Sequence, residues 1–339
     1  MSGATAGGVT RKPEPFWKEI ALRRNWFSWK VSIAALFVCA VSAAPVYAQL
    51  NTQHIKGTVG LKAGSQPPPH VYVVAPLFYV YNTDEVKTRE GNSLPIDVSL
   101  NSVVYGAGVN VVTTKKLFGG NYGYTVLFPV GANNRIQGTE IDQNPGAGLT
   151  DSVVTPLSLG WHFKRADVTA SYTIFLPTGR FTAGASNNTG FGMWGQEPAI
   201  GTTVYLDEAR KLHAATTASF TFSSKKEDSD TKVGTAMNLE GGVGADFLEG
   251  GLTAGLVYYT SMKLQQDRIQ GFPQILIRGK NRVVALGPEV QLALAKGGKL
   301  YGFLKVNYQW EVYARTNTQG SELTMMLSWL MKPITLPTK

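Results

Sequence analysis

The sequence predicts an all-β fold: a transmembrane antiparallel up-and-down β-barrel of about twelve strands, preceded by an N-terminal signal peptide. Three observations predict it: side chains that alternate between apolar and polar, connections that alternate between short and long, and the composition. Of 339 residues, 43% are hydrophobic and only 16% are charged, against about 25% charged in a typical soluble protein. Beyond the first fifty residues no apolar run approaches the roughly 20 residues of a membrane-spanning helix.

Residues 1–48 have the features of a signal peptide. A basic stretch ending at Lys30 precedes a short apolar core, and Val46-Tyr47-Ala48 fits cleavage near Ala48, so we expect an exported mature chain. These residues carry +4 of the chain's formal net charge of +9. The remaining charge is spread too thinly for a nucleic-acid partner. Cys39 is the only cysteine, so the mature chain would have no disulfide and no cysteine-based metal site.

Alternation with a period of two is clearest at 298–314, where one face carries every charge, including Lys305 and Glu311, and the other is apolar through Val312 and Ala314. A helix would mix these two sets, whereas a strand separates them. The same pattern predicts strands at about 70–83, 98–113, 121–131, 151–163, 166–177, 197–206, 212–223, 232–248, 250–261, 281–295, 298–314 and 320–331.

The connections distinguish a membrane barrel from a soluble sandwich. Short turns are expected at 115–120, 164–165, 207–211, 249 and 296–297. They alternate with mostly long loops at 84–97, 132–150, 178–196, 224–231 and 262–280, with 315–319 as the short exception. Short turns on one rim and long loops on the other are typical of outer-membrane barrels.

Aromatic residues near the strand ends suggest the girdles that mark the two membrane interfaces. The residues expected on the lipid face are Tyr122, Tyr124, Trp161, Phe163, Tyr205, Tyr258, Tyr308, Trp310 and Trp329.

No pattern of catalytic residues is present. The sequence has no HExxH metal motif, no nucleophile elbow and no phosphate loop. Ser158 and His162 would share the lumen face, but four residues along a strand span about 13 Å, too far for a hydrogen bond. We therefore expect no enzyme, no catalytic residue, no bound metal and no cofactor.

Charged residues within the strands should face the lumen, because a charge on the lipid face costs roughly 2–4 kcal/mol near the midplane. These residues are Glu240, Asp246, Glu289, Lys305, Glu311 and Glu322. Two interpretations stay open: a solvated or mutually paired lining, or a selectivity surface in which Lys305 balances neighbouring carboxylates. On the second interpretation Glu240, Glu289, Lys305 and Glu311 would guide solute passage.

The 178–196 loop mixes glycine with large apolar side chains. Its candidates for solute contact are Arg180, Phe181, Phe191, Met193 and Trp194. The loop either folds inward as an apolar binding site or packs on its own rim. Arg180 would then hydrogen-bond a solute oxygen or brace the loop against Glu197.

Several motifs resemble a known family. They are Gln66-Pro67-Pro68-Pro69-His70-Val71-Tyr72, Gly148-Leu149-Thr150-Asp151, Pro156-Leu157-Ser158-Leu159-Gly160-Trp161, Leu176-Pro177-Thr178-Gly179-Arg180-Phe181, Asn188-Thr189-Gly190 with Trp194 and Glu197-Pro198, Ala285-Leu286-Gly287-Pro288, and Asn317-Thr318-Gln319-Gly320. In this order they resemble the bacterial outer-membrane "meta-pathway of phenol degradation" transporter family. The family usually has glycine before the first tyrosine and a Gly-Asp pair after Gly-Leu, where this chain has His70-Val71 and Thr150-Asp151.

The resemblance implies an outer-membrane channel for passive uptake of small hydrophobic or aromatic, phenol-like compounds, with outer-membrane lipid and the barrel-assembly machinery as partners. A structural or surface-recognition barrel with a closed lumen is the alternative. The expected organisation is a signal peptide at 1–48, a periplasmic or lumen segment at 49–69, the barrel at 70–331 and a tail at 332–339.

Overall fold

The computed structural model describes residues 51–138, 141–271 and 280–335, which form an all-β protein. The predicted signal peptide lies outside the described residues. Among the described residues, no helix is both long and apolar enough to cross a bilayer. The strands are β1 (His70–Val86), β2 (Val98–Leu117), β3 (Gly120–Gly138), β4 (Ile141–Gln143), β5 (Gly148–Leu149), β6 (Ser152–His162), β7 (Ala166–Leu176), β8 (Gly195–Tyr205), β9 (Leu212–Ser223), β10 (Ala236–Phe247), β11 (Leu252–Lys263), β12 (Arg282–Lys296), β13 (Lys299–Arg315) and β14 (Thr318–Thr335).

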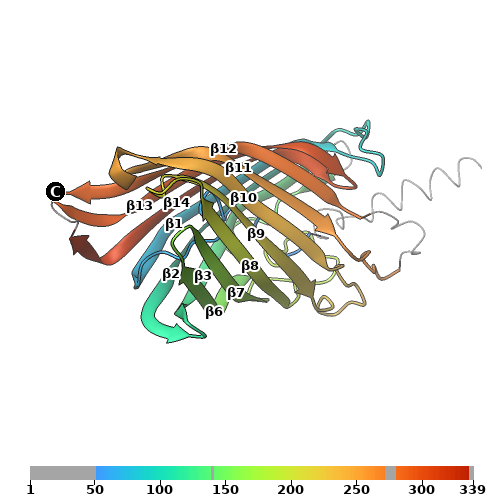
Figure 1. Cartoon of the computed structure of the whole chain (residues 1–339). Coiled ribbons are helices and arrows are strands. Elements are labelled where there is room, and N and C mark those ends of the chain that lie inside the picture. Colours follow the sequence, from blue (N-terminus) through green and yellow to red (C-terminus); the bar gives the residue numbers. More distant parts are fainter. Residues whose placement is uncertain (1–50, 139–140, 272–279, 336–339) are drawn as a thin grey trace, which may run out of the picture. The chain divides into compact units, whose positions relative to one another are not determined.

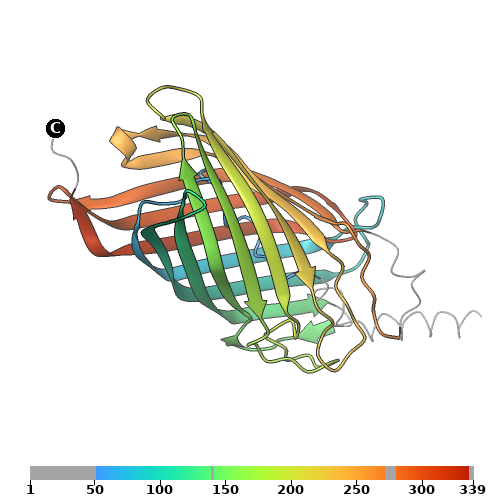
Figure 2. The same cartoon turned by 60° about the horizontal axis from the view of Figure 1, so that its bottom comes forward.

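Twelve long strands close into a barrel (Figures 1 and 2). Each long strand pairs antiparallel with its neighbours along the chain, β6 pairs with β3, and β1 pairs with β14 to complete the ring. Closure leaves no unpaired strand edge, which a bilayer would not tolerate. The predicted fold class is confirmed.

Some predicted strand ends are wrong. Strand β3 continues to Gly138, into the predicted 132–150 loop, because its ladder with β2 extends as far as the pair Val98–Gly138. The short β4 and β5 also pair with β3. At the C-terminus β14 runs to Thr335, because Ile334 pairs with Leu300 at the start of β13.

The connections alternate as predicted. The β2–β3 turn consists of Phe118 and Gly119, both at positive φ (51° and 80°), as expected for a two-residue turn that matches strand twist. By contrast, the connection from β7 to β8 spans 177–194. Because the long strands run alternately up and down, the long loops gather on one rim and most short turns on the other.

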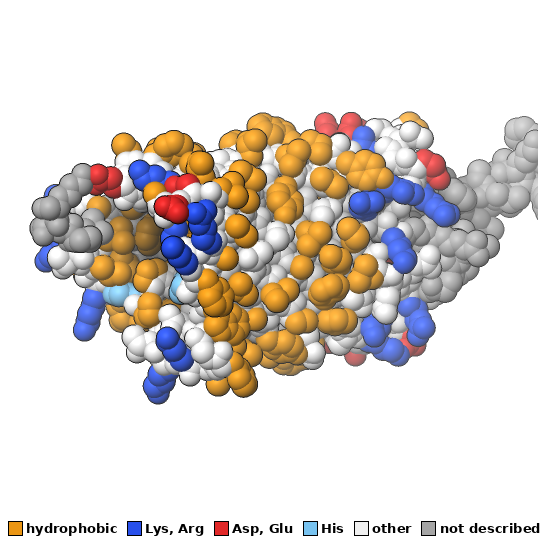
Figure 3. Space-filling model, in the orientation of Figure 1, with side chains coloured by type: hydrophobic (Ala, Val, Ile, Leu, Met, Phe, Trp, Pro, Cys, Tyr) orange, Lys and Arg blue, Asp and Glu red, His pale blue; other side chains and the backbone are white. Residues whose placement is uncertain are grey.

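The outer surface of the barrel is an apolar belt. Leu256, Ile200 and Val243 are 68%, 61% and 59% exposed, and Figure 3 shows apolar side chains spread over the wall, with Lys and Arg gathered toward its ends. In water such a surface would promote aggregation, whereas in a membrane it contacts the hydrocarbon chains of the lipids. The belt therefore identifies the lipid-facing side of the wall.

Two predicted faces are wrong. Tyr205 is buried, and its hydroxyl donates to Asp167 at 2.7 Å inside the barrel, so it is not a girdle residue. On β13, Val312 and Tyr313 are both exposed while Ala314 is buried. A β-bulge causes this, because one extra residue in the ladder with β12 reverses the alternation.

Residues 51–66 form a lumen segment that runs through the barrel. Near the long-loop rim the Gln53 amide donates to the Met193 carbonyl at 2.6 Å, and near the short-turn rim the Ser65 hydroxyl donates to Asp167 at 2.7 Å. The segment turns at Gly57 and Gly60, both at positive φ (72° and 82°). A side chain at either glycine would collide with a carboxylate of the wall.

Candidate functional site

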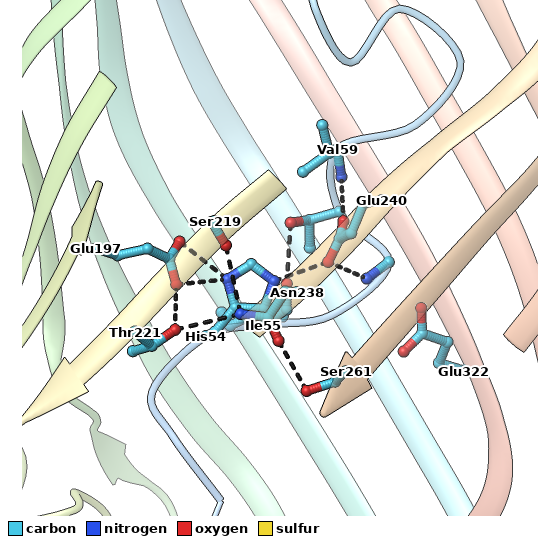
Figure 4. A network of polar contacts seen from close by, with 12 residues as sticks. His54, Ile55, Val59, Glu197, Ser219, Thr221, Asn238, Glu240, Ser261 and Glu322 are labelled. Atoms are coloured by element: carbon cyan, nitrogen blue, oxygen red, sulfur yellow. Dashed lines mark hydrogen bonds and ion pairs between the residues drawn. The ribbon is translucent and has the colours of Figure 1, made fainter. Parts of the chain in front are cut away.

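His54 attaches the lumen segment to the wall (Figure 4). Its Nδ1 lies 2.9 Å from Glu197 on β8, and its Nε2 lies 2.8 Å from Glu240 on β10. Two carboxylates can only accept hydrogen bonds, so both ring nitrogens must carry a proton. His54 is therefore an imidazolium cation between two buried anions.

The carboxylates of β10 and β12 also bind the backbone of the segment. Glu240 accepts the N–H groups of Gly57 and Val59, both at 3.1 Å, and Glu289 accepts that of Leu61 at 2.9 Å. Hydrogen bonds to a charged acceptor are stronger than neutral ones. The predicted lumen carboxylates are thus occupied in holding the segment and do not form a free lining.

Lys305 on β13 binds a carbonyl rather than a carboxylate. Its Nζ donates to the Thr58 carbonyl oxygen, and within the described part of the chain it forms no ion pair shorter than 4 Å. Beside it, Asn307 donates to the Gly57 carbonyl at 3.0 Å. Lys305 therefore contacts the backbone of the segment, and its role in balancing the neighbouring carboxylates stays a prediction.

Glu311 anchors a cluster of tyrosines. Tyr81 and Tyr259 each donate to it at 2.8 Å, and the Gly320 N–H donates at 2.7 Å. The ammonium group of Lys56, on the segment, lies 3.7 Å away. Three hydrogen bonds thus satisfy the carboxylate before Lys56 is counted.

Arg180 does not contact Glu197. Its guanidinium donates to the carbonyls of Asn187 at 2.8 Å and Pro145 at 2.9 Å, both in the long loops. Glu197 is held instead by His54 and Thr221. Arg180 is therefore an exposed brace between two loops.

The apolar residues of the 178–196 loop differ in burial. Met193 is 1% exposed, whereas Trp194 is 51% exposed. Phe181 and Phe191 both lie near Lys226, whose Nζ is 5.1 Å and 5.8 Å from their ring centres. The apolar solute site in this loop stays a prediction.

Lys226 and Asp151 support this loop and were not among the predicted site residues. Lys226 donates to the Phe191 carbonyl at 3.0 Å, while Asp151 accepts the N–H groups of Phe191 and Gly179 at 3.1 Å and 3.3 Å. Burial lowers the pKa of Lys226 to about 8 and raises the pKa of Asp151 to about 6. Lys226 falls in a run of charged residues, which by itself predicts a solvated loop.

A cavity of about 270 Å³ lies at the long-loop end of the lumen, between the start of the segment and the wall. Its apolar walls include Leu100, Val104, Pro129, Ile136, Val153 and Phe191. Its polar lining includes Asn51, Thr52, Gln53, His54, Lys56, Tyr79, Tyr81, Ser102, Asp151 and Thr318. Of the nine predicted candidates, Phe191 alone is among the described residues that line this cavity.

The chain is similar in structure to the COG4313 outer membrane channel of Pseudomonas putida F1, with a TM-score of 0.65 and 13% identity over 82% of this chain and 100% of that one. It is less similar to the P. putida toluene transporter TodX, with a TM-score of 0.39 and 10% identity over 81% of this chain and 92% of that one. No curated protein matches the sequence. The model of the family described as "Putative MetA-pathway of phenol degradation" matches residues 50–327, and the chain belongs to this family.

Proposed function

We propose that the protein is an outer-membrane channel for passive uptake of small hydrophobic or aromatic compounds. The observation that carries the proposal is the largely apolar cavity at the long-loop end of a barrel whose outer face suits lipid. A pocket with apolar walls and a few polar groups is the usual form of a small-molecule site. The family's description, which refers to phenol degradation, supports the same solute class.

The route to the membrane belongs to the same proposal. Residues 1–48 direct export and are removed near Ala48, and the barrel-assembly machinery inserts residues 70–331 into the outer membrane. The strand closure between β1 and β14 and the apolar belt support this, because both suit a bilayer. The protein takes no part in chemistry on the solute.

A closed structural barrel is the second candidate. The observation that favours it is the lumen segment, which contacts the wall from Gln53 near one rim to Ser65 near the other. For the channel to work, a solute must pass beside this segment or displace it. The two candidates therefore differ in a measurable way: only the channel speeds solute uptake.

Uptake by intact cells with and without the protein tests the proposal. Radiolabelled phenol and toluene should enter faster when the protein is present, and a sugar should not. Val104→Trp fills the cavity, whereas Val103→Trp, the matched control, places the same side chain on the opposite face of the strand. The first variant should abolish the gain and the second should retain it.

Equal uptake of aromatics with and without the protein would overturn the channel and favour the closed barrel. Faster uptake that Val104→Trp leaves unchanged would place the path outside this cavity. Heat-modifiable gel mobility confirms that each variant is folded.

A further inference from the structure

We propose that the outside of the barrel wall holds a phosphate group of a phosphorylated glycolipid in the outer leaflet. The residues that bind it are Arg282 of β12, Arg315 of β13 and Arg89 in the connection from β1 to β2, and we call them the arginine site. This inference goes beyond the proposed function, because it concerns the lipid around the wall and does not depend on what passes through the lumen.

Register and burial place two of these arginines on the outer face of the wall. Arg282 lies opposite Arg315 in the ladder between β12 and β13. The adjacent pair, Val283 and Ala314, is 0% and 1% exposed and packs with Tyr259 on the lumen side. Because successive side chains on a strand point to opposite faces, Arg282 and Arg315 point away from the lumen.

The outer face of these two strands changes from apolar to aromatic to cationic toward the long-loop rim. Leu286 pairs with Trp310 in the exposed apolar belt, and Val284 pairs with the exposed Tyr313. The arginine pair follows two residues later, about 7 Å closer to the rim. Figure 3 likewise shows Lys and Arg gathered toward the ends of the wall. Aromatic side chains lie at the level of lipid headgroups, so the guanidinium groups lie at the level of lipid phosphates.

The described part of the chain does not neutralise these charges. Within it, Arg89, Arg282 and Arg315 form no ion pair shorter than 4 Å, whereas Lys87, close to Arg89, pairs with Glu85 at 2.5 Å. Like charges directly opposite each other in a sheet are destabilising. An anion between the two guanidinium groups would remove this cost.

The arginine site also has hydrogen-bond donors available. A guanidinium group carries several N–H donors in a planar fork. Arg315 uses its Nε, which donates to the Arg89 carbonyl at 2.6 Å and so directs the side chain toward the β1–β2 connection. Its other donors, and those of Arg282, have no acceptor among the described residues. The fork matches phosphate oxygens through paired hydrogen bonds, so the free donors suit a phosphate.

A lipid is the occupant that this position favours. The arginine pair continues the lipid-facing belt, so an acyl chain can lie along Leu286 and Trp310 while the phosphate meets the arginines. A free phosphate would make only the second contact. The long-loop rim of an outer-membrane barrel faces the cell exterior, and basic residues at a membrane surface attract anionic headgroups. The structure therefore favours a lipid that carries its phosphate in the outer leaflet.

Binding of fluorescently labelled lipid A to the immobilised full-length protein in detergent tests the inference. The competitors are unlabelled bisphosphorylated lipid A, its dephosphorylated form and inorganic phosphate. The bisphosphorylated lipid should compete at least about tenfold better than the dephosphorylated one, the range for hydrogen bonds to a charged group. Inorganic phosphate should compete more weakly than the bisphosphorylated lipid, because it lacks the acyl contacts.

The double variant Arg282→Gln with Arg315→Gln removes both charges and should weaken binding of bisphosphorylated lipid A by about tenfold or more. Binding of the dephosphorylated form should not change. Arg282→Lys with Arg315→Lys keeps the charges but loses the planar fork, so its affinity should fall between the two. Heat-modifiable gel mobility confirms that each variant is folded.

Lys296→Gln with Lys299→Gln is the matched control, because these exposed lysines form the cross-strand pair at the other end of the same two strands. It should bind lipid A as the unmodified protein does. Equal loss in the lysine and arginine variants would show that any pair of cations suffices and would overturn the inference.

Two further results would also overturn it. Equal competition by the two forms of lipid A would mean that the phosphate is not recognised. Competition by inorganic phosphate as strong as that by the lipid would show a site for free anions only.

Discussion

Two regions of the barrel wall differ in charge. Residues 71–83, 98–114 and 120–134, which make up most of β1, β2 and β3, contain no charged residue. From β8 to β14, by contrast, charged side chains line the lumen, and they include Glu197, Glu240, Asp246, Glu289, Lys305, Glu311 and Glu322. We call these regions the uncharged sector and the charged sector.

The lumen segment follows this division. Its His54 and the backbone groups of Gly57, Thr58, Val59 and Leu61 bond to the charged sector. The cavity lies on the other side of the segment, against Leu100 and Val104 of the uncharged sector. The charged sector therefore holds the segment, while the uncharged sector leaves room for an apolar solute.

An apolar cluster lies near the short-turn rim, where β1 and β2 meet β13 and β14. Tyr72, Val112 and Leu330 are buried together there, and Phe303 and Ile334 pack against them. This packing uses no charge, unlike the attachment of the segment.

Deleting residues 51–64 should change conductance the most, because it removes most of the lumen segment that the charged sector binds. The barrel should still assemble, since closure between β1 and β14 does not involve the segment. Single-channel conductance in planar bilayers should rise several-fold and become cation-selective, because the freed carboxylates outnumber Lys305. Unchanged conductance would mean that the long loops or the apolar cluster also close the lumen.

Replacing His54 by Ala should have the next largest effect. It leaves Glu197 and Glu240 buried without their shared cation, and breaking a buried pair costs about 3–5 kcal/mol. The segment should then leave the wall more often. Maleimide labelling of a Leu61→Cys reporter, whose native side chain is 1% exposed, should accelerate by about 10²–10⁴-fold.

The control is His70→Ala, because His70 bonds only to its neighbour Val71 among the described residues. Labelling should not change in this variant. Equal labelling in the two histidine variants would show that His54 does not hold the segment.

The sequence predicts the wall well, because each strand face meets a different solvent and alternation records that difference. The six charges expected in the lumen lie there, with Glu240 and Glu322 buried at 2% and 1% exposure. The bulge at Val312 was not predicted, because an extra residue in a strand ladder does not change the residue types around it.

The site was harder to predict for two physical reasons. Residues 51–66 show no alternation, because an irregular segment satisfies its backbone with wall side chains rather than with a strand partner. The sequence therefore places Lys56 and His54 in a periplasmic or lumen segment and indicates no role for either. The contact between Lys226 and Phe191 is likewise non-local, and no spacing in the sequence reports it.

Arginine substitutions on the two faces of β12 should have a smaller effect than loss of His54. Leu286 is 50% exposed on the apolar belt, so Leu286→Arg should cost about 2–4 kcal/mol in the bilayer and lower the folded yield. Gln291→Arg, five residues away on the lumen face, should assemble normally. Folded yield by gel mobility measures both, and equal damage would mean that the faces are assigned wrongly.

Replacing Asn307 by arginine tests a lumen position that contacts the segment. Asn307 also faces the lumen, but it is 1% exposed and holds the Gly57 carbonyl. Asn307→Arg should therefore assemble as a barrel yet release the segment, which the Leu61→Cys reporter would detect. A lumen position is tolerant only where the segment does not touch it.

The smallest expected effect is a change with pH in the stability of the 178–196 loop. Asp151 and Lys226, which contact this loop, are buried at 5% and 6% exposure. The pKa of Asp151 is raised to about 6, so the folded loop binds a proton between pH 4 and 6 that the open loop has already lost. Loop stability should therefore fall as the pH rises through this range. The pKa of Lys226 is lowered to about 8, so loop stability should rise again between pH 8 and about 10.

The loop is thus weakest near pH 7, where both groups are charged, and attraction between Lys226 and the carboxylates of Asp151 and Asp267 only partly offsets their burial. Two pKa units correspond to at most about 3 kcal/mol. Hydrogen exchange of the Phe191 and Gly179 amides, which donate to Asp151, measures the effect once intrinsic rates are removed. Asp151→Asn should abolish the change between pH 4 and 6 and preserve the change above pH 8. A flat profile in the unmodified protein would show that the loop closes the cavity without help from these two charges.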